Sequence, residues 1–198
     1  KEKGKEKERR KRGGGEEKKE EEEKKSINIP LALNLVPQKV LDSYERICNG
    51  IIKGLANIEI QSKFIPLNDI VVPTNSTEGP PAQKISGNAQ TRKKGIILQH
   101  GTILKGVDVD KMFELLKVPD EKMKGKLIKT IKERVTSIDN HTNAQLSFQD
   151  IVDTLILGFK QEFSEIDFVE ESLTEEEIAA AEKLASEKYA TKTWNYQR

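Results

Sequence analysis

The chain has 198 residues, enough for one domain with a sizeable core, and carries 34 basic and 33 acidic side chains. Residues 1–25 hold 12 of the basic and 9 of the acidic residues, which leaves 22 and 24 in residues 26–198 and gives no footprint typical of nucleic-acid binding. The single cysteine, Cys48, excludes an internal disulfide, and no apolar run matches a membrane span or a signal peptide. We therefore expect a cytoplasmic protein without nucleic-acid or membrane partners.

Residues 1–25 are predicted to be a charged low-complexity tail, disordered because it has no apolar side chain to bury. The body, residues 26–198, opens with SINIPLALNL, which is typical of a buried strand that breaks near Pro30. Pro37 then opens a predicted helix whose apolar residues recur at helical spacing up to Leu55. Cys48 lies within that apolar stripe, which favours a core residue over a reactive thiol.

The segments IEIQSKF, DIVVP, KISGNAQTR and GIILQHGTILK follow as predicted strands, the last two joined by a basic turn into an antiparallel hairpin. The C-terminal half is predicted to be helical, with one short strand, IDFVEE, before the final helix. Ser147 with Asp150 and Thr174 with Glu177 are predicted capping boxes. Strands that precede helices, rather than alternating with them, predict an α+β fold with a mixed, largely antiparallel sheet and flanking helices.

The hairpin carries a group of polar side chains. Lys84, Ser86, Asn88 and Gln90 alternate with Ile85, Gly87 and Ala89, and a period of two predicts that these four polar groups share one face. The partner strand places Gln99-His100-Gly101-Thr102 among aliphatic residues. A Lys84 ammonium held in a partly enclosed site would suit a carboxylate or a phosphate. The alternative is a solvent-facing sheet with an extended lysine side chain.

Other polar residues have weaker patterns. Asn68 and Asp69 are either a turn pair or a site where Asp69 offers its carboxylate to magnesium. His100 taken alone is more typical of a packed, hydrogen-bonded histidine, and His141 lies in a polar loop where replacement by alanine is expected to have no effect. The sequence contains no Ser-His-Asp arrangement and no Walker loop.

The segments LNDIVV, KISGNAQ and QHGTIL resemble the signature of the lipoate–protein ligase A family, apart from an extra stretch near residues 73–82. The segment KYAT followed by Trp194-Asn195 resembles the end of the catalytic domain of that family, so the resemblance covers roughly residues 26–198. Arg9 to Gly15 also resembles the start of the family's glycine loop, but a Glu-rich run follows it and the family has a longer upstream region. We interpret the chain as truncated or altered at its N-terminus.

The resemblance implies a biotin/lipoate ligase fold, similar to class II synthetases, in which lipoate and ATP form lipoyl-adenylate with Mg²⁺. Lys84 would be the catalytic lysine, and Asn68 and Asp69 would lie near the nucleotide phosphates, with Asp69 at the metal. The lipoate and adenylate pockets would be lined by Ser86, Gly87, Ala89, His100, Gly101 and Thr102, with Gly13, Gly14 and Gly15. The implied acceptors are lipoyl domains of 2-oxoacid dehydrogenase E2 subunits and the glycine cleavage H protein. A chain that stops soon after Trp194 is also similar to forms that work with a separate accessory subunit.

Two alternatives stay open. An octanoyltransferase of the same fold uses a cysteine acyl-enzyme, but residues 61–66, near where that cysteine would fall, contain none, which favours the ligase. The other alternative is a non-catalytic or partner-dependent relative that holds a lipoyl group or a carrier domain.

Overall fold

The computed structural model describes residues 24–75, 79–115 and 121–197. These residues form two compact units, one ending at Phe163 and the other beginning at Ser164. The single ligase-like core that the sequence predicted over residues 26–198 stays a prediction. The predicted tail lies outside the described residues except for Lys24 and Lys25, which belong to the first strand.

The first unit contains one sheet of five antiparallel strands in the order β1-β5-β4-β3-β2. The strands are β1 (Lys24–Ala32), β2 (Lys63–Ile65), β3 (Asp69–Pro73), β4 (Ala82–Lys93) and β5 (Ile96–Leu104). The predicted hairpin is β4–β5, and its two turn residues, Lys94 and Gly95, have positive φ values of 53° and 77°. Such a turn follows the right-handed twist of its strands. The predicted α+β fold with a largely antiparallel sheet is confirmed.

Some predicted strand boundaries are wrong. Pro30 does not break β1 but lies inside it, opposite Leu98 of β5. This is tolerated because β1 is the edge strand, where a missing N–H costs no ladder hydrogen bond on the open side. The predicted strand IDFVEE is not formed, since residues 166–171 have no paired strand in the described structure. IEIQSKF becomes a strand only from Lys63.

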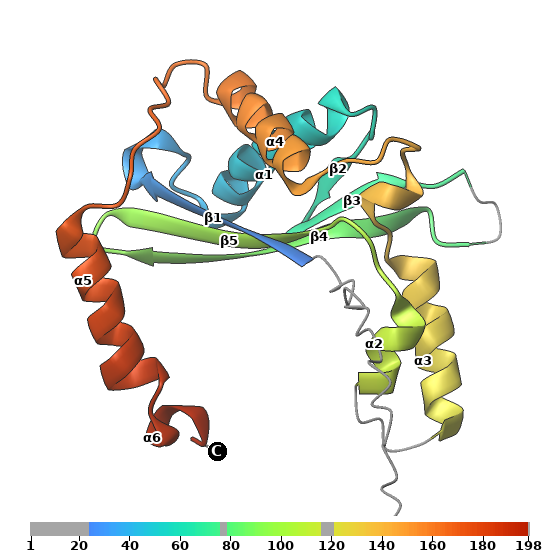
Figure 1. Cartoon of the computed structure of the whole chain (residues 1–198). Helices are drawn as coiled ribbons and strands as arrows, with labels where there is room; N and C mark the ends of the chain where they lie inside the picture. The colour runs from blue at the N-terminus through green and yellow to red at the C-terminus, as the bar shows by residue number, and fades with distance from the viewer. Residues whose placement is uncertain (1–23, 76–78, 116–120, 198) are drawn as a thin grey trace, which may run out of the picture. The chain divides into compact units, whose positions relative to one another are not determined.

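Helices α1 (Val40–Asn57) and α4 (Phe148–Glu162) lie side by side over one face of the sheet (Figure 1). Their inward side chains and those of the sheet form the core, which removes apolar area from water at about 25 cal/mol per Å². The prediction that Cys48 is a core residue is confirmed. The core comprises Cys48, Ile51, Leu55, Ile60, Ile70, Val72, Ile85, Ile103, Ile138, Ile151 and Leu155.

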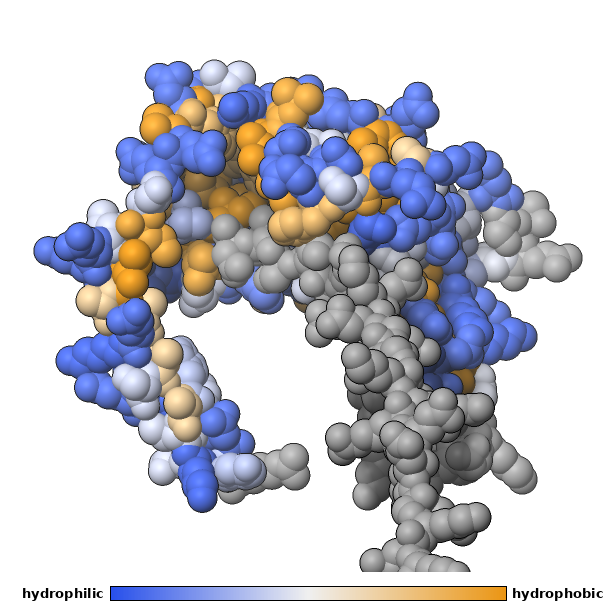
Figure 2. Space-filling view, in the orientation of Figure 1, coloured by the Kyte–Doolittle hydropathy of each residue, from blue (hydrophilic) through white to orange (hydrophobic). Residues whose placement is uncertain are grey.

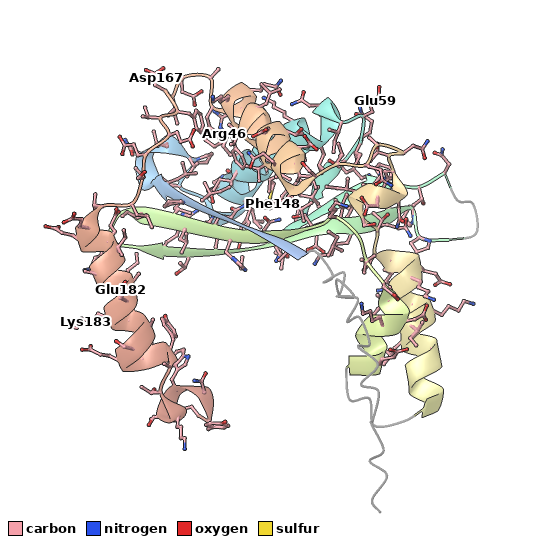
Figure 3. The ribbon with its side chains drawn as sticks, viewed as in Figure 1. Arg46, Glu59, Phe148, Asp167, Glu182 and Lys183 are labelled. Carbon is pink, nitrogen blue, oxygen red and sulfur yellow. The ribbon has the colours of Figure 1, made fainter. Side chains whose placement is uncertain are left out.

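The two helices approach closely because glycines face each other where they cross. A Cβ on Gly158 of α4 would overlap backbone atoms of Gly50 and Gly54 on α1. Nearby, the buried carboxylate of Glu162 contacts Arg46 at 2.6 Å and Lys53 at 2.7 Å. Figure 3 shows Arg46 in this helical layer. Two cations around one buried carboxylate balance its charge, which would otherwise be costly to bury.

Several shorter elements complete the chain. The first unit also holds α2 (Val109–Leu115), α3 (Glu121–Arg134) and 3-10 turns at Leu33–Leu35 and Ile138–Asn140. The second unit consists of α5 (Glu175–Leu184), a π-helical turn at Ala185–Tyr189 and α6 (Lys192–Asn195). Figure 2 shows hydrophobic surface over the helical layer of the first unit, where Phe148, Ile156 and Leu157 are half-exposed. Among the described residues, no helix is long and apolar enough to cross a membrane.

Both predicted capping boxes are confirmed, and the one at α4 gives a stability prediction. Ser147 Oγ accepts from Asp150 N at 3.2 Å, and Asp150 Oδ2 accepts from Ser147 N at 2.7 Å. We expect Ser147→Ala to lower the free energy of unfolding by about 1 kcal/mol in urea titrations at neutral pH. Thr130→Ala is the control, because Thr130 Oγ1 donates only to Lys126 O of its own helix.

The pH dependence of this cap has a definite sign. Hydrogen bonds from Ser147 lower the pKa of Asp150, so the cap stabilises the fold above the ordinary carboxyl range and loses that contribution as the pH falls. The difference between wild type and Ser147→Ala should therefore shrink in acid. A difference that grew in acid would contradict this assignment.

Candidate functional site

Lys84 lies near the start of β4, where its side chain meets an acidic residue from the neighbouring strand. Its Nζ is 2.6 Å from Asp69 Oδ1. That oxygen is buried and makes no hydrogen bond of good geometry with the described residues, so its contact with Lys84 is an ion pair alone. The Lys84 side chain is 42% exposed and that of Asp69 33%. The described residues therefore enclose the ammonium only in part.

The end of the Lys84 side chain lies directly over Gly87, in the space that a larger side chain would fill. Cε and Nζ of Lys84 both lie 2.8 Å from the position that a Cβ on Gly87 would take. Across the sheet, Gly87 pairs with Asp69 of β3 and with Thr102 of β5. Directly opposite residues point to the same face of a sheet. Asp69, Gly87 and Thr102 therefore form one row, with the Lys84 ammonium over its middle.

The predicted alternation along this strand is wrong at Lys84. The pairing of β3 with β4 shifts between Ile70 and Val71, because Ile70 pairs with Ser86 whereas Val71 pairs with Lys84. Ile85 is left as the extra residue of a bulge, and an extra residue reverses the alternation of faces. Lys84 therefore shares the face of Gly87 and not that of the other three polar residues, Ser86, Asn88 and Gln90.

Those three residues belong to a polar network beneath α1. Gln90 Oε1 accepts from Ser43 of α1 at 3.1 Å, and Gln90 Nε2 donates to Gln99 Oε1 at 3.0 Å. Asn88 Nδ2 donates to Ser86 Oγ at 3.3 Å. Ser86, Asn88 and Gln99 are all buried. Their hydrogen bonds offset part of the cost of burying polar groups under a helix, although Asn88 Oδ1 is buried without a partner among the described residues.

The predicted site residues thus divide between two faces of the sheet. Ala89 pairs with His100, so both join Lys84, Asp69, Gly87 and Thr102 on the face that α1 and α4 leave uncovered. Ser86 and Gly101 lie on the helix-covered face, where Asn88 Oδ1 occupies the place of a Gly101 side chain. Gly13, Gly14 and Gly15 lie outside the described residues.

Asn68 holds the two strands together at this point. Its backbone oxygen accepts from Asn88 N at 3.0 Å and from Asn88 Nδ2 at 3.1 Å, and its own amide donates to Asn88 O. These contacts hold the backbone immediately before Asp69. Asn68 therefore positions Asp69. These hydrogen bonds of Asn68 all go to Asn88 and not to Asp69, Gly87 or Thr102.

A segment that no sequence pattern marked, Val135 and Thr136, supports the backbone of Lys84. Thr136 N donates to Lys84 O at 2.9 Å, and Val135 forms a parallel bridge with Lys84. Thr136 Oγ1 in turn lies 2.8 Å from Nε2 of His141, which was predicted to be incidental. No local pattern marks this contact, because 51 or more residues separate its two sides along the chain.

A family model described as the lipoyl protein ligase A/B catalytic domain matches residues 2–160. The chain belongs to this family. The match includes the charged N-terminal segment and ends before the second unit, whereas the resemblance found in the sequence covered residues 26–198. The family assignment and the biotin/lipoate ligase fold predicted from the sequence are confirmed.

Relatives and solved structures in this family carry two kinds of name. The chain is 30% identical to octanoyltransferase LipM of Brevibacillus brevis, and the match covers 82% of the chain and 64% of that protein. It is also 30% identical to octanoyltransferase LipM of Staphylococcus epidermidis, and that match covers 75% of the chain and 60% of the relative. It is similar to a bi-partite lipoate protein ligase from Thermoplasma acidophilum, with a TM-score of 0.70 and 28% identity. That match covers 86% of this chain and 62% of the ligase chain. A lipoate-protein ligase A bound with ATP gives a TM-score of 0.61 and 26% identity, with coverage of 86% and 63%. The chain thus spans about three-fifths of the length of these relatives.

The single thiol within these 198 residues is not available as a nucleophile. Cys48 is fully buried on α1, and burial raises its pKa to about 12. We expect iodoacetamide at pH 8 to label the folded chain about a thousandfold more slowly than the urea-unfolded chain, as measured by mass spectrometry. Rapid stoichiometric labelling of the folded chain would contradict this.

The raised pKa of Cys48 also affects stability. The contribution of the neutral thiol to the free energy of unfolding is fully present at pH values below the ordinary thiol pKa, and it is lost as the pH rises towards 12.

The site fits magnesium only when the nucleotide supplies further ligands. Among the described residues, no group of three or more His, Cys, Asp or Glu side chains could hold a metal ion. Magnesium in nucleotide sites is commonly held by one or two carboxylates together with substrate phosphates. Asp69, with one oxygen buried against Lys84 and its side chain partly exposed, can supply one such carboxylate.

Proposed function

We propose that the chain is the catalytic core of an ATP-dependent lipoate–protein ligase. The observation that carries the proposal is the Lys84 ammonium, held 2.6 Å from Asp69 over the bare backbone of Gly87. A fixed cation on the sheet face opposite α1 and α4 would stabilise the anionic transition state of acyl activation more than the ground state. The acceptors would be lysines of lipoyl carrier domains, in E2 subunits or in the glycine cleavage H protein.

The proposed reaction has two steps. A lipoate carboxylate oxygen attacks the α-phosphorus of ATP, a new P–O bond forms, and the bond from that phosphorus to the bridging oxygen breaks as pyrophosphate leaves. The carrier amine then attacks the acyl carbonyl, an amide forms, AMP leaves and the amine loses a proton. Lys84 would contact the carboxylate and then the acyl phosphate, while Gly87, Ala89, His100 and Thr102 line the acyl group. Magnesium, bound with the nucleotide near Asn68 and Asp69, would neutralise pyrophosphate charge.

An octanoyltransferase is the second candidate, because relatives 30% identical to the chain carry that name. A cysteine acyl-enzyme needs a thiolate that the substrate can reach. Within these 198 residues the only cysteine is buried on the opposite side of the sheet from Lys84, with its pKa raised to about 12. The buried thiol favours the ligase.

Two assays on the purified chain separate the candidates. With lipoate, ATP and Mg²⁺, we expect pyrophosphate release and lipoylation of an added lipoyl domain, and Cys48→Ala should keep both. Octanoyl transfer from an octanoyl-carrier protein without ATP, lost in Cys48→Ala, would overturn the ligase in favour of the transferase. Binding of a non-hydrolysable lipoyl-adenylate mimic without any turnover would instead support a non-catalytic or partner-dependent relative.

The Gly87 contact gives a variant that should affect activity but not folding. An added Cβ would meet the flexible end of Lys84 at 2.8 Å, so the lysine, and not the sheet, must move. We expect Gly87→Ala to lower lipoate-dependent pyrophosphate release at least about tenfold while the melting temperature stays within a few degrees of wild type. Gly95→Ala is no suitable control, because Gly95 has a φ of +77°. Gly106→Ala is suitable, since its added Cβ would meet only Asp139 at 3.1 Å. Unchanged activity in Gly87→Ala would contradict the placing of Lys84.

A further inference from the structure

The Lys84 ammonium, which the proposed substrate needs, is already paired with the carboxylate of Asp69. The ammonium is 2.6 Å from Asp69 Oδ1 and contacts Gly87. A carboxylate is therefore already bound to it before any substrate arrives. The lipoate carboxylate has the same charge and the same oxygen ligands as the Asp69 side chain. The two carboxylates therefore compete for one cation.

We propose that Asp69 is a competing counter-ion that keeps the affinity of the unliganded site for a free carboxylic acid low. This inference rests on the proposed function, because it takes Lys84 as the group that receives the acid. Asp69 is well suited to the role. Among the residues that the structure describes, its buried Oδ1 has no hydrogen-bond donor besides the ion pair, so the lysine is the group that compensates its charge there.

A consequence for the order of binding follows from this competition. Releasing Lys84 leaves Asp69 with a buried, uncompensated oxygen, which is costly unless another cation replaces the ammonium. A divalent cation carried by nucleotide phosphates is the class of ligand that would take Asp69 and free Lys84. The acid should therefore bind more tightly after the nucleotide than before it, and by reciprocity the nucleotide should bind more tightly after the acid.

The test measures lipoate binding to the full chain by calorimetry without nucleotide. We expect Asp69→Asn to bind lipoate about tenfold more tightly than wild type, because the amide keeps the shape of the side chain but removes the competing charge. Lys84→Met should bind lipoate more weakly than wild type, and the double variant should resemble Lys84→Met. A gain in affinity is a result that mere damage to the structure would not produce.

Asp139→Asn is the matched control, since Asp139 forms another partly exposed pair with a lysine, Lys105, at 3.3 Å. It should leave lipoate binding unchanged. Equal or weaker binding by folded Asp69→Asn would overturn the inference, and Asp69→Ser provides the same comparison if the asparagine variant does not fold. If Lys84→Met lost binding while Asp69→Asn gained none, the inference would fail and the proposed function would stand. If Lys84→Met bound lipoate as well as wild type, the Lys84 assignment would fail with it.

Discussion

Lys84→Ala is expected to lower lipoate-dependent pyrophosphate release by a factor of about a hundred to a thousand. A charge-stabilising donor at a developing anion contributes in this range. The effect should fall on kcat more than on KM, because the interaction strengthens as negative charge develops on the transferred group. The variant should remain folded because the Lys84 side chain is 42% exposed, but its free energy of unfolding should fall, since the buried Asp69 Oδ1 loses the cation that compensates it.

Two further variants make this result specific. Lys93→Ala removes a lysine from the far end of the same strand, which is exposed, and should keep wild-type activity. Lys84→Met keeps the aliphatic stem over Gly87 and should be as inactive as Lys84→Ala. Equal activity of wild type and Lys84→Ala would remove Lys84 from the proposed site.

Gly158→Ala is expected to lower the free energy of unfolding by about 2–3 kcal/mol. Its added methyl group would overlap backbone atoms of Gly50 and Gly54, which cannot rotate away as a side chain can. Helices α1 and α4 would have to separate, and overpacking of this kind costs more than the better helix propensity of alanine restores. Urea titration monitored by circular dichroism measures the change.

Gly125→Ala makes the same chemical change where space is open. No described atom lies within 4 Å of the position that a Cβ on Gly125 would take, and the residue lies inside α3. Alanine should there stabilise the first unit by about 0.5–1 kcal/mol through helix propensity alone. Opposite signs for the two variants would confirm the close helix crossing, whereas a neutral Gly158→Ala would contradict it.

The local features of the chain could be predicted from short stretches of sequence. The antiparallel hairpin, the two capping boxes and the apolar stripe that contains Cys48 each depend on residues within a few positions of one another. Periodicity and capping are local properties, and the tertiary structure left them unchanged. The family signature was likewise readable, because its motifs are contiguous segments.

Sequence patterns could not predict features that depend on distant backbone. The edge position of β1, which permits Pro30, follows from which strands pair. The segment at Val135 and Thr136 reaches Lys84 only after the chain has formed two helices. The break between the two units after Phe163 likewise has no counterpart in the predicted order of elements.

The sequence by itself determined the type of fold, the antiparallel pairing of the hairpin strands and the lysine that the family signature marks. Only the tertiary structure decided on which face of the sheet that lysine lies. A period of two assumes uninterrupted pairing, and the bulge opposite Ile70 and Val71 inserts one residue that turns Lys84 towards Gly87 and Asp69. The insertion depends on the register of β3 against β4, and a register is a relation between two strands that neither strand encodes alone.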